Sequence, residues 1–193
     1  MARSGRDSGS LRSPCTKNSS NSCSLPSTRF FFSSGDMRYP LRMLREVEGY
    51  TTALLAEVEE LEGQLFDNSF NATTIARELD SGAKLWVVEG PTCLEGYMLL
   101  RTEGGVTDIL RLGVRPLLQG RGVGSSLLGE AKSSFGRLML CVRKTNTRAI
   151  QLYQRQGFVI TGDLGVSWVM ELHRLLNERR AAVEAPRDLL AVR

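Results

Sequence analysis

The apolar residues of this sequence recur at two different spacings, and each spacing predicts one kind of element. One set falls three or four positions apart, which is the period of a helix with one buried face: Leu54, Leu55, Val58 and Leu61. It predicts a helix over residues 50–62 that ends at Gly63. A second, shorter helix is expected over 73–79, after a loop over 65–71 that carries two phenylalanines.

Shorter apolar runs, bounded by glycine, proline and charged residues, predict β-strands. The expected ranges are 39–47, 84–89, 94–102, 107–114, 138–143, 158–161 and 166–172. The strands over 107–114 and 138–143 flank a helical stretch, so we expect them to lie parallel, joined by a right-handed crossover. A last helix is expected over 147–156, capped by Asn146 and stopped by Gly157. This alternation predicts an α/β protein.

The stretch 109–128 contains a strand, a turn, a glycine-rich loop and a helix in direct succession. Pro116 cannot donate a hydrogen bond to a strand partner, so the strand should end before it. The glycines at 120, 122 and 124 let the backbone pass close to a ligand. Apolar residues then recur at helical spacing: Val123, Leu127, Leu128, Ala131 and Phe135.

A glycine-rich loop that leads into a helix N-terminus predicts an anion site, because several N–H groups and the positive end of the helix dipole point at one spot. Two familiar phosphate fingerprints do not fit. The dinucleotide fingerprint needs a further glycine where Ser125 or Leu127 stands. The P-loop needs a lysine after Gly129, but Glu130 follows. A nucleotide-binding module is therefore disfavoured.

Charge and cysteine content narrow the class of protein. The formal net charge is +4, of which residues 1–36 carry +3, so the remainder is close to neutral and nucleic-acid binding is not expected. No apolar run reaches the roughly 18 residues of a membrane span. The four cysteines form no C-x-x-C pair and only one histidine is present, so no metal site is expected. The isolated Cys93 and Cys141 suit a reduced setting, and we expect a cytoplasmic protein.

Residues 1–36 are rich in Ser, Arg and Asn and have few large apolar side chains, so we expect a disordered tail. Organelle targeting by this segment is an alternative, since Arg and Ser enrichment with few acids also describes a transit peptide. A start of translation at Met37 or Met43 is another. At the other end, 174–193 is polar, and we expect a frayed helix or tail.

Two motifs in sequence order carry a family resemblance. The first, Gln/Arg-x-x-Gly-x-Gly/Ala, is met by Gln119, Gly122 and Gly124. The second, Asn-x-x-Ala-x-x-x-Tyr-x-x-x-Gly-Phe, begins at Asn146. Together they resemble the GNAT superfamily of N-acetyltransferases, and within it the subgroup that acetylates the N-terminal alanine of a ribosomal protein. We assign the GNAT domain to residues 37–173.

The resemblance implies a fold and a ligand. The fold is a strongly twisted mixed sheet, splayed at its central parallel strands and flanked by about four helices, with acetyl-CoA in the gap. The glycine loop would bind the pyrophosphate, Arg121 the 3′-phosphate, and the edge of the strand at 112–114 the pantetheine, with an N–H near Val114 polarising the thioester. The implied cofactor-binding residues are Leu112, Gly113, Val114, Gln119, Gly120, Arg121, Gly122, Val123, Gly124, Ser125 and Asn146.

Tyr153 is the implied general acid, because in the family the tyrosine at this place protonates the leaving thiolate. Ordinary thiol and phenol pKa values of about 8.5 and 10 make such a transfer feasible. The alternative is a core tyrosine on an amphipathic helix. Asn146 has two candidate roles, capping its helix and bonding the pantetheine.

The general base is where the sequence departs from the ribosomal-protein subgroup. That subgroup has a glutamate on the strand before Asn146, and Cys141 stands there instead. A cysteine is a poor base for an amine, and a small buried side chain is the simpler interpretation. Asp108 could act through a water molecule, and Glu171 and His173 are further candidates.

The sequence therefore predicts an enzyme that moves an acetyl group from acetyl-CoA to a primary amine, on either a peptide N-terminus or a small molecule. The alternative is an acetyl-CoA-binding sensor without turnover. Expected partners are acetyl-CoA and the amine, and a homodimer is an open possibility. Neither membrane nor nucleic acid is expected as a partner.

Overall fold

The computed structural model describes residues 29–31 and 42–173, and the following elements lie within them. The strands are β1 (Arg29–Phe31), β2 (Arg42–Val47), β3 (Lys84–Glu89), β4 (Leu94–Glu103), β5 (Val106–Val114), β6 (Arg137–Arg143), β7 (Val159–Asp163) and β8 (Ser167–His173). The helices are α1 (Thr52–Leu65), α2 (Ala72–Asp80), α3 (Val123–Ser134) and α4 (Thr147–Arg155), with a 3₁₀ turn η1 (Pro116–Leu118).

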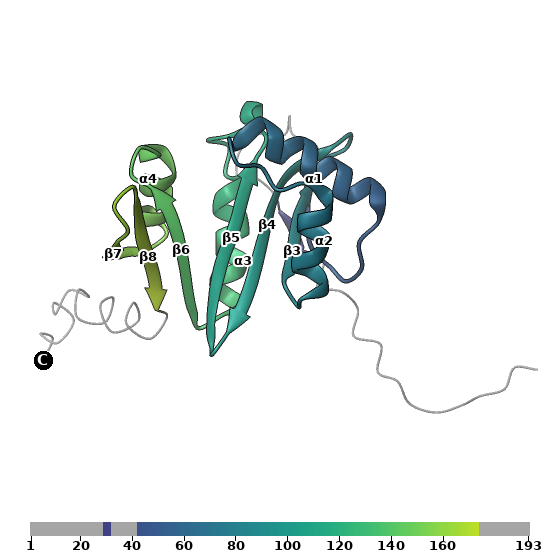
Figure 1. Ribbon diagram of the computed structural model, residues 1–193. Coiled ribbons are helices and arrows are strands. Elements are labelled where there is room, and N and C mark those ends of the chain that lie inside the picture. The colour runs from purple at the N-terminus through teal and green to yellow at the C-terminus, as the bar shows by residue number, and fades with distance from the viewer. Residues whose placement is uncertain (1–28, 32–41, 174–193) are drawn as a thin grey trace, which may run out of the picture.

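The strands form one mixed sheet in the order β1-β2-β3-β4-β5-β6-β8-β7 (Figure 1). Among the described strands only β5 and β6 run parallel, and α3 provides the crossover between them. Every other neighbouring pair is antiparallel. The expected mixed sheet with central parallel strands is confirmed.

The two parallel strands separate soon after they begin. They pair only at Thr107 with Leu138 and at Asp108 with Met139. Beyond these positions they diverge, and the gap widens toward the end of the sheet where α1 and α4 lie (Figure 1). The expected splay is therefore present, and it divides the sheet into one half made of β1–β5 and another made of β6, β8 and β7.

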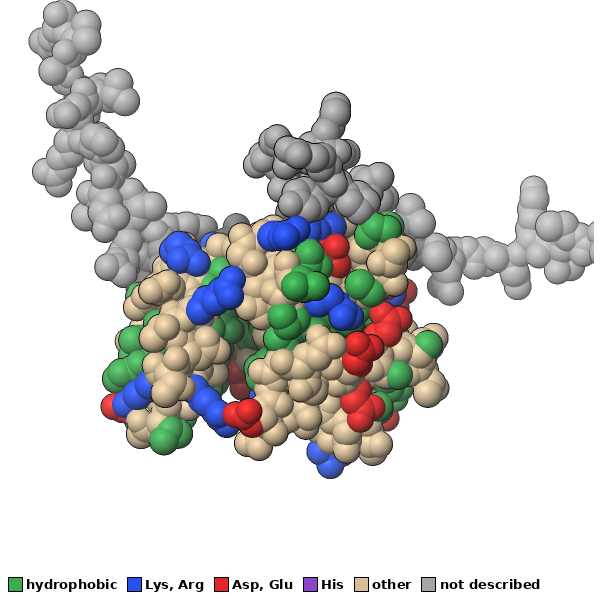
Figure 2. All heavy atoms as spheres, turned by 90° about the horizontal axis from the view of Figure 1, so that it is seen from above, with side chains coloured by type: hydrophobic (Ala, Val, Ile, Leu, Met, Phe, Trp, Pro, Cys, Tyr) green, Lys and Arg blue, Asp and Glu red, His purple; other side chains and the backbone are tan. Residues whose placement is uncertain are grey.

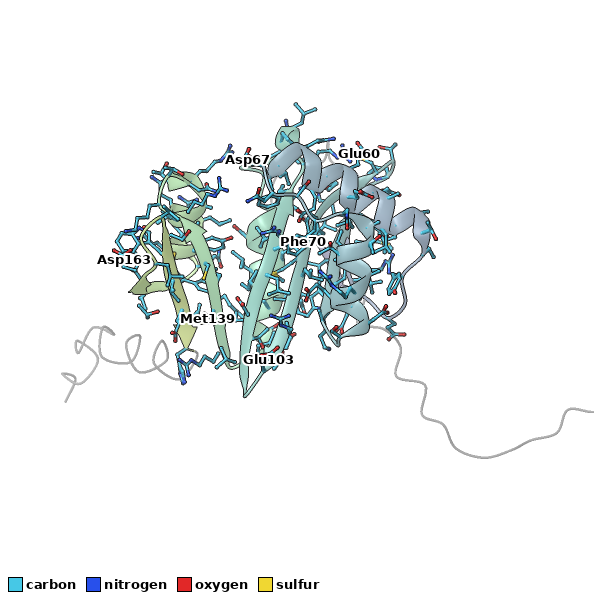
Figure 3. All side chains as sticks on the ribbon, viewed as in Figure 1. Glu60, Asp67, Phe70, Glu103, Met139 and Asp163 are labelled. Atoms are coloured by element: carbon cyan, nitrogen blue, oxygen red, sulfur yellow. The ribbon has the colours of Figure 1, made fainter. Side chains whose placement is uncertain are left out.

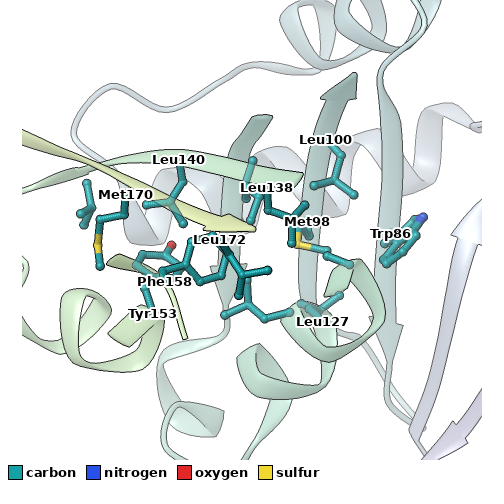
Figure 4. Close-up of a cluster of buried hydrophobic side chains, with 14 of the residues drawn as sticks. Trp86, Met98, Leu100, Leu127, Leu138, Leu140, Tyr153, Phe158, Met170 and Leu172 are labelled. Atoms are coloured by element: carbon teal, nitrogen blue, oxygen red, sulfur yellow. The ribbon is translucent and has the colours of Figure 1, made fainter. Parts of the chain in front are cut away.

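A separate apolar core covers each face of the sheet. On the α1 face, α1 and α2 pack against β3 and β4 through residues such as Val58, Leu61 and Leu99. On the opposite, α3 face, Leu127 and Leu128 of α3 and residues of α4 pack against β3–β6 and β8 (Figure 4). The α3-face core crosses the splay and joins the two halves.

Side-chain caps explain where the helices begin. Thr51 Oγ1 accepts from the Leu54 N–H at 3.2 Å and Asn71 Oδ1 accepts from the Thr74 N–H at 2.8 Å. The expectation that Gly63 ends α1 is wrong. The helix continues to Leu65, because the Phe66 N–H still bonds to the Glu62 carbonyl at 2.9 Å and Leu65 packs against the α1-face core.

The expectation of disorder over 1–36 does not hold for three of its residues. Arg29–Phe31 form β1, antiparallel to β2, because an apolar run that could not form a core alone can extend an existing sheet. The rest of the expected tail, the start of the strand over 39–47 and the C-terminal tail over 174–193 lie outside the described residues. No helix in the described part is long and apolar enough to cross a membrane.

Candidate active site

The splay leaves one edge of β5 open. From Ile109 to Val114 the side of β5 that faces β6 has no strand partner among the described residues. Apart from the Val114 carbonyl, which accepts from Gln119, the backbone groups on this side are therefore available to an extended ligand, which could bind as an added strand does. Seen from above, the surface is hollowed between the two halves of the sheet, with basic side chains on both sides of the opening (Figure 2).

The glycine loop lies next to this open edge. Gly120 and Gly122 have φ values of +80° and +87°, in the left-handed region that favours glycine. Gly122 is the N-cap of α3 and supplies no side-chain cap. The N–H groups of the first turn, at Val123, Gly124 and Ser125, therefore keep their capacity to bind an anion.

Helix α4 packs closely against the start of α3. A Cβ placed on Gly124 would lie 3.3 Å from Leu152 Cδ2, so glycine permits this close approach. Val123 is 2% exposed, and its side chain belongs to the core. Of Val123 and Gly124, only the backbone can therefore face a ligand.

The side chain of Gln119 is engaged within the protein. Its Nε2 donates to the Val114 carbonyl at 3.1 Å, and its Oε1 accepts from Arg148 Nη1 at 3.0 Å. Gln119 thus ties the end of β5 to α4. Sequence reasoning did not single out Arg148, whose guanidinium lies 3.3 Å from a Cβ placed on Gly120 and brings a positive charge to the glycine loop. Arg121 lies in the same loop and is exposed.

Asn146 caps α4 as predicted, since its Oδ1 accepts from the Ala149 N–H at 3.1 Å. Tyr153, on the same helix, is 8% exposed and lies in the α3-face core beside Phe158, with the two rings edge to face and 5.7 Å between centroids (Figure 4). Burial raises the pKa of Tyr153 to about 12. The phenol therefore keeps its proton throughout the physiological range.

Asp108 and Cys141 approach each other across the base of the splay, on the α1 face. Asp108 lies opposite Arg101, which bonds to Glu78 of α2 at 3.0 Å and so marks that face. Cys141 lies between two residues of β6 that point into the α3-face core, so it points the other way. Cys141 is exposed, so the expectation of a small buried side chain is wrong, because its strand position turns it away from the α3-face core and toward the splay. Burial raises the pKa of Asp108 despite the nearby Arg101, and partial desolvation together with the Asp108 charge raises the pKa of the Cys141 thiol.

The other two base candidates lie away from the opening. Glu171 is paired with Arg137 at 2.7 Å and accepts from Thr161 Oγ1 at 3.3 Å. His173 pairs in register with Arg137 at the first residue of β6, the closed end of the splay. Asp108 is thus the candidate carboxylate at the splay itself.

Gly113 is a glycine for a reason that the motif did not indicate. A Cβ there would lie 2.4 Å from Tyr97 Cε1 and 3.0 Å from Leu65 Cδ1, both on the α1 face. The Tyr97 ring therefore occupies the space above Gly113, and only the backbone of this residue can meet a ligand.

The loop between α1 and α2 borders the opening on the α1 face (Figure 3). Asp67 in this loop forms an ion pair with Arg143 of β6, with 3.1 Å between Oδ2 and Nη1. The pair crosses the splay, because the two residues belong to opposite halves of the sheet. Both side chains are largely exposed, at 87% and 59%, so the pair contributes little stability and can open readily.

Comparison with known proteins agrees with this geometry. The sequence profile of the acetyltransferase (GNAT) family matches residues 48–158, which is more than half of the chain. No curated protein matches the sequence closely enough to count as a relative.

Solved structures show the same fold at low sequence identity. The ribosomal-protein-S18-alanine N-acetyltransferase from Escherichia coli has a TM-score of 0.60 and 18% identity, over 68% of this chain and 93% of that one. PaiA N-acetyltransferase from Thermoplasma acidophilum, in complex with coenzyme A, has a TM-score of 0.58 and 16% identity, over 67% and 98%. A GNAT family acetyltransferase from Elizabethkingia anophelis, with acetyl-CoA bound, has a TM-score of 0.54 and 15% identity, over 68% and 97%.

Proposed function

Because the chain belongs to the acetyltransferase (GNAT) family and is therefore an acyltransferase, we propose that it moves the acetyl group of acetyl-CoA to a primary amine. The observation that carries this proposal is the separation of the parallel strands β5 and β6 beside the uncapped N-terminus of α3. The open strand edge suits an amide-bearing pantetheine, and the helix N-terminus suits a pyrophosphate.

The residues around the glycine loop fit the coenzyme as a substrate. The first-turn N–H groups of α3, from Val123 to Ser125, bind the pyrophosphate. Arg121 within the loop and Arg148 beside it add positive charge. The open edge of β5 at Leu112–Val114 holds the pantetheine, and an N–H group of this edge stabilises the oxyanion that forms on the thioester carbonyl. Asn146 remains a candidate for a further bond to the pantetheine.

The acceptor approaches from the α1 face. Its nitrogen attacks the thioester carbon, a C–N bond forms and the C–S bond breaks. The proton that the amine loses passes through a water molecule to the Asp108 carboxylate, and the departing sulfur receives a proton from the Tyr153 hydroxyl. For the next turnover, Asp108 releases its proton to solvent and the Tyr153 phenolate takes one up from solvent. Cys141 lines the site but does not act as the base, because its raised pKa disfavours the thiolate.

Burial changes how Tyr153 contributes. Its pKa of about 12 lies well above the ordinary thiol value of about 8.5, so complete proton transfer to the sulfur costs roughly 5 kcal/mol. A hydrogen bond to the developing thiolate is available without that cost. Tyr153 therefore acts first as a hydrogen-bond donor to the leaving sulfur, and full transfer of its proton is the costlier second step.

A weak base favours amines that lose a proton easily. Deprotonation at pH 7 costs about 1.4 kcal/mol for an α-amine with a pKa near 8, against about 4.6 kcal/mol for a lysine near 10.4. The turn between β7 and β8 is short and carries no tyrosine, which leaves the acceptor side open. The favoured acceptors are peptide N-termini and small amines of low pKa.

A thiol-release assay of the full chain with acetyl-CoA tests this proposal across a panel of peptides and small amines. Amine-dependent release, with equal formation of the acetylated amine, is the expected result. Binding of acetyl-CoA without release of the thiol in the presence of any amine would contradict the enzyme and favour an acetyl-CoA sensor. Faster turnover of lysine side chains than of α-amines would contradict the acceptor preference.

A further inference from the structure

One arginine of β5 holds the loop between α1 and α2 in place. Arg111 Nη2 donates to the Asn68 carbonyl at 2.9 Å. Its guanidinium carbon lies 3.9 Å from the ring centre of Phe70 and 5.1 Å from that of Phe66. A single side chain thus contacts the first, middle and last part of the loop 66–70, through one hydrogen bond and two cation–π contacts.

A buried carboxylate completes this attachment. Glu62, at the end of α1, is 0% exposed. It accepts hydrogen bonds from the Phe70 N–H at 2.8 Å and from the Tyr97 hydroxyl, and its Oε1 lies 3.4 Å from Arg111 Nε. Burial and the Glu62 charge raise the pKa of Tyr97, so that the phenol stays a donor. A buried carboxylate needs such partners, and here they join the loop to β4 and β5.

Arg111 lies next to the strand edge assigned to the pantetheine, and its side chain lies on the α1 face of the sheet. It directly precedes Leu112, the first residue of the strand edge assigned to the pantetheine. Arg111 pairs with Leu99 of the α1-face core, whereas Leu112 pairs with Met98 of the α3-face core. The Arg111 side chain therefore acts on the α1 face, where the amine approaches, and not on the face of the glycine loop.

The loop that Arg111 holds borders the opening of the splay. Asp67, within it, bridges to Arg143 on the other half of the sheet (Figure 3). Phe66 and Phe70 are only partly buried, so their rings remain available to a bound molecule. Any shift of this loop changes the width and the wall of the opening on the α1 face.

We propose that Arg111 is a positioning residue that fixes the loop 66–70 for the amine acceptor. The inference rests on the proposed function, since it assigns the loop to the acceptor. Lysine cannot replace arginine here, because an ammonium group cannot stack its plane on two rings while donating to a carbonyl. The residue does not touch the reacting atoms, so its effect falls on the KM of the amine.

The test compares Arg111→Gln and Arg111→Lys with the wild-type chain. Arg111→Gln is expected to raise the KM of the amine about tenfold, the loss of one charge-assisted contact, and to leave the KM of acetyl-CoA within about twofold. The KM of the amine for Arg111→Lys should lie between those of the wild-type chain and Arg111→Gln. Hydrogen exchange at the Phe70 amide should accelerate in the same order, because its acceptor Glu62 loses a fixed partner.

Arg45→Gln is the matched control. Arg45 is also a partly exposed strand arginine paired with a glutamate, Glu89, at 2.6 Å, but it lies on β2, away from the splay. This control should change neither KM nor the Phe70 exchange rate. Equal changes in both KM values, or no change in either, would overturn the inference while leaving the acetyl transfer intact.

The failure of the proposed function has a different signature. If the wild-type chain acetylates no amine, both the proposed function and the acceptor role of Arg111 are contradicted. Should Arg111→Gln fold poorly in a thermal melt, Arg111→Lys still decides the question. Unchanged amine KM and unchanged Phe70 exchange in the lysine variant would overturn the proposal.

Discussion

At the scale of single residues, burial sets the protonation of the two side chains assigned to proton transfer. Asp108 lies at the base of the splay and Tyr153 in the α3-face core, and burial raises the pKa of both. The consequences differ. A raised pKa makes Asp108 a somewhat stronger base once it is ionised, whereas it makes Tyr153 a more reluctant acid. In the proposed mechanism, donation of a proton by Tyr153 is therefore less favourable than uptake of a proton by Asp108.

Asp108→Asn should remove activity without removing stability. General bases contribute about 10²–10⁴-fold in rate, so kcat/KM should decrease by a factor in that range. The wild-type pH profile should have an acid limb above the ordinary carboxyl range, and this limb should disappear in the variant. The folded state holds the Asp108 proton more tightly than the unfolded chain does, so ionisation at neutral pH favours unfolding. Asparagine removes that cost, and the Tm at pH 7 should stay level or rise. A Tm several degrees lower would show that the carboxylate is structural.

Tyr153→Phe separates the hydroxyl from the ring. The edge-to-face contact with Phe158 survives the change, so the free energy of unfolding should shift by less than about 1 kcal/mol. The expected effect is a fall in kcat of about 10²-fold or more, with the KM of acetyl-CoA little changed. Steady-state kinetics beside a denaturant melt measures both quantities. An unchanged kcat would leave Tyr153 as a core residue only.

At the scale of elements, glycines set how closely the site can be packed. Gly113 is the clearest case, since a Cβ there would lie 2.4 Å from the Tyr97 ring. Gly129 of α3 has no such packing constraint, because no atom of the described residues beyond its own helix lies within 4 Å of a Cβ placed there. The same residue type thus has a packing role on β5 and none in the middle of a helix.

Gly113→Ala should destabilise the chain by about 1–3 kcal/mol, because the ring of Tyr97 has to move and carries its bond to Glu62 with it. Gly129→Ala is the matched control and should stabilise by about 0.5–1 kcal/mol, since alanine is the better helix former. Urea unfolding of both variants measures the two values. Similar free energies for the two would mean that the Tyr97 packing is soft.

The sequence predicted most of the elements, but it missed β1 and the end of α1, and it did not predict the contacts between elements. Apolar spacing located the helices and strands, and two motifs located the glycine loop and α4. Side-chain partners that are distant in sequence could not be predicted. Gln119 is an example, because no local pattern indicates that its amide oxygen accepts from Arg148 of α4. Arg111 and Glu62 were missed for the same reason, since 49 positions separate two residues that tertiary structure brings together.

At the scale of the whole molecule, the separation of the two halves of the sheet is the feature on which the proposed function depends. The α3-face core holds the halves together across the splay, while the α1-face core covers only the first half. In the proposed mechanism this one opening offers two approaches, from the glycine loop for the coenzyme and from the α1 face for the amine. We propose that the reaction takes place where they meet, along the open edge of β5.

Hydrogen exchange of the full chain, with and without acetyl-CoA, tests this account most directly. The account predicts that bound acetyl-CoA slows exchange along the open edge of β5, over 109–114, and in the glycine loop and first turn of α3, over 120–125. Amides of β2 and β3, in the first half of the sheet, should not change. Binding without protection of these two segments would contradict it and would place the coenzyme elsewhere on the molecule.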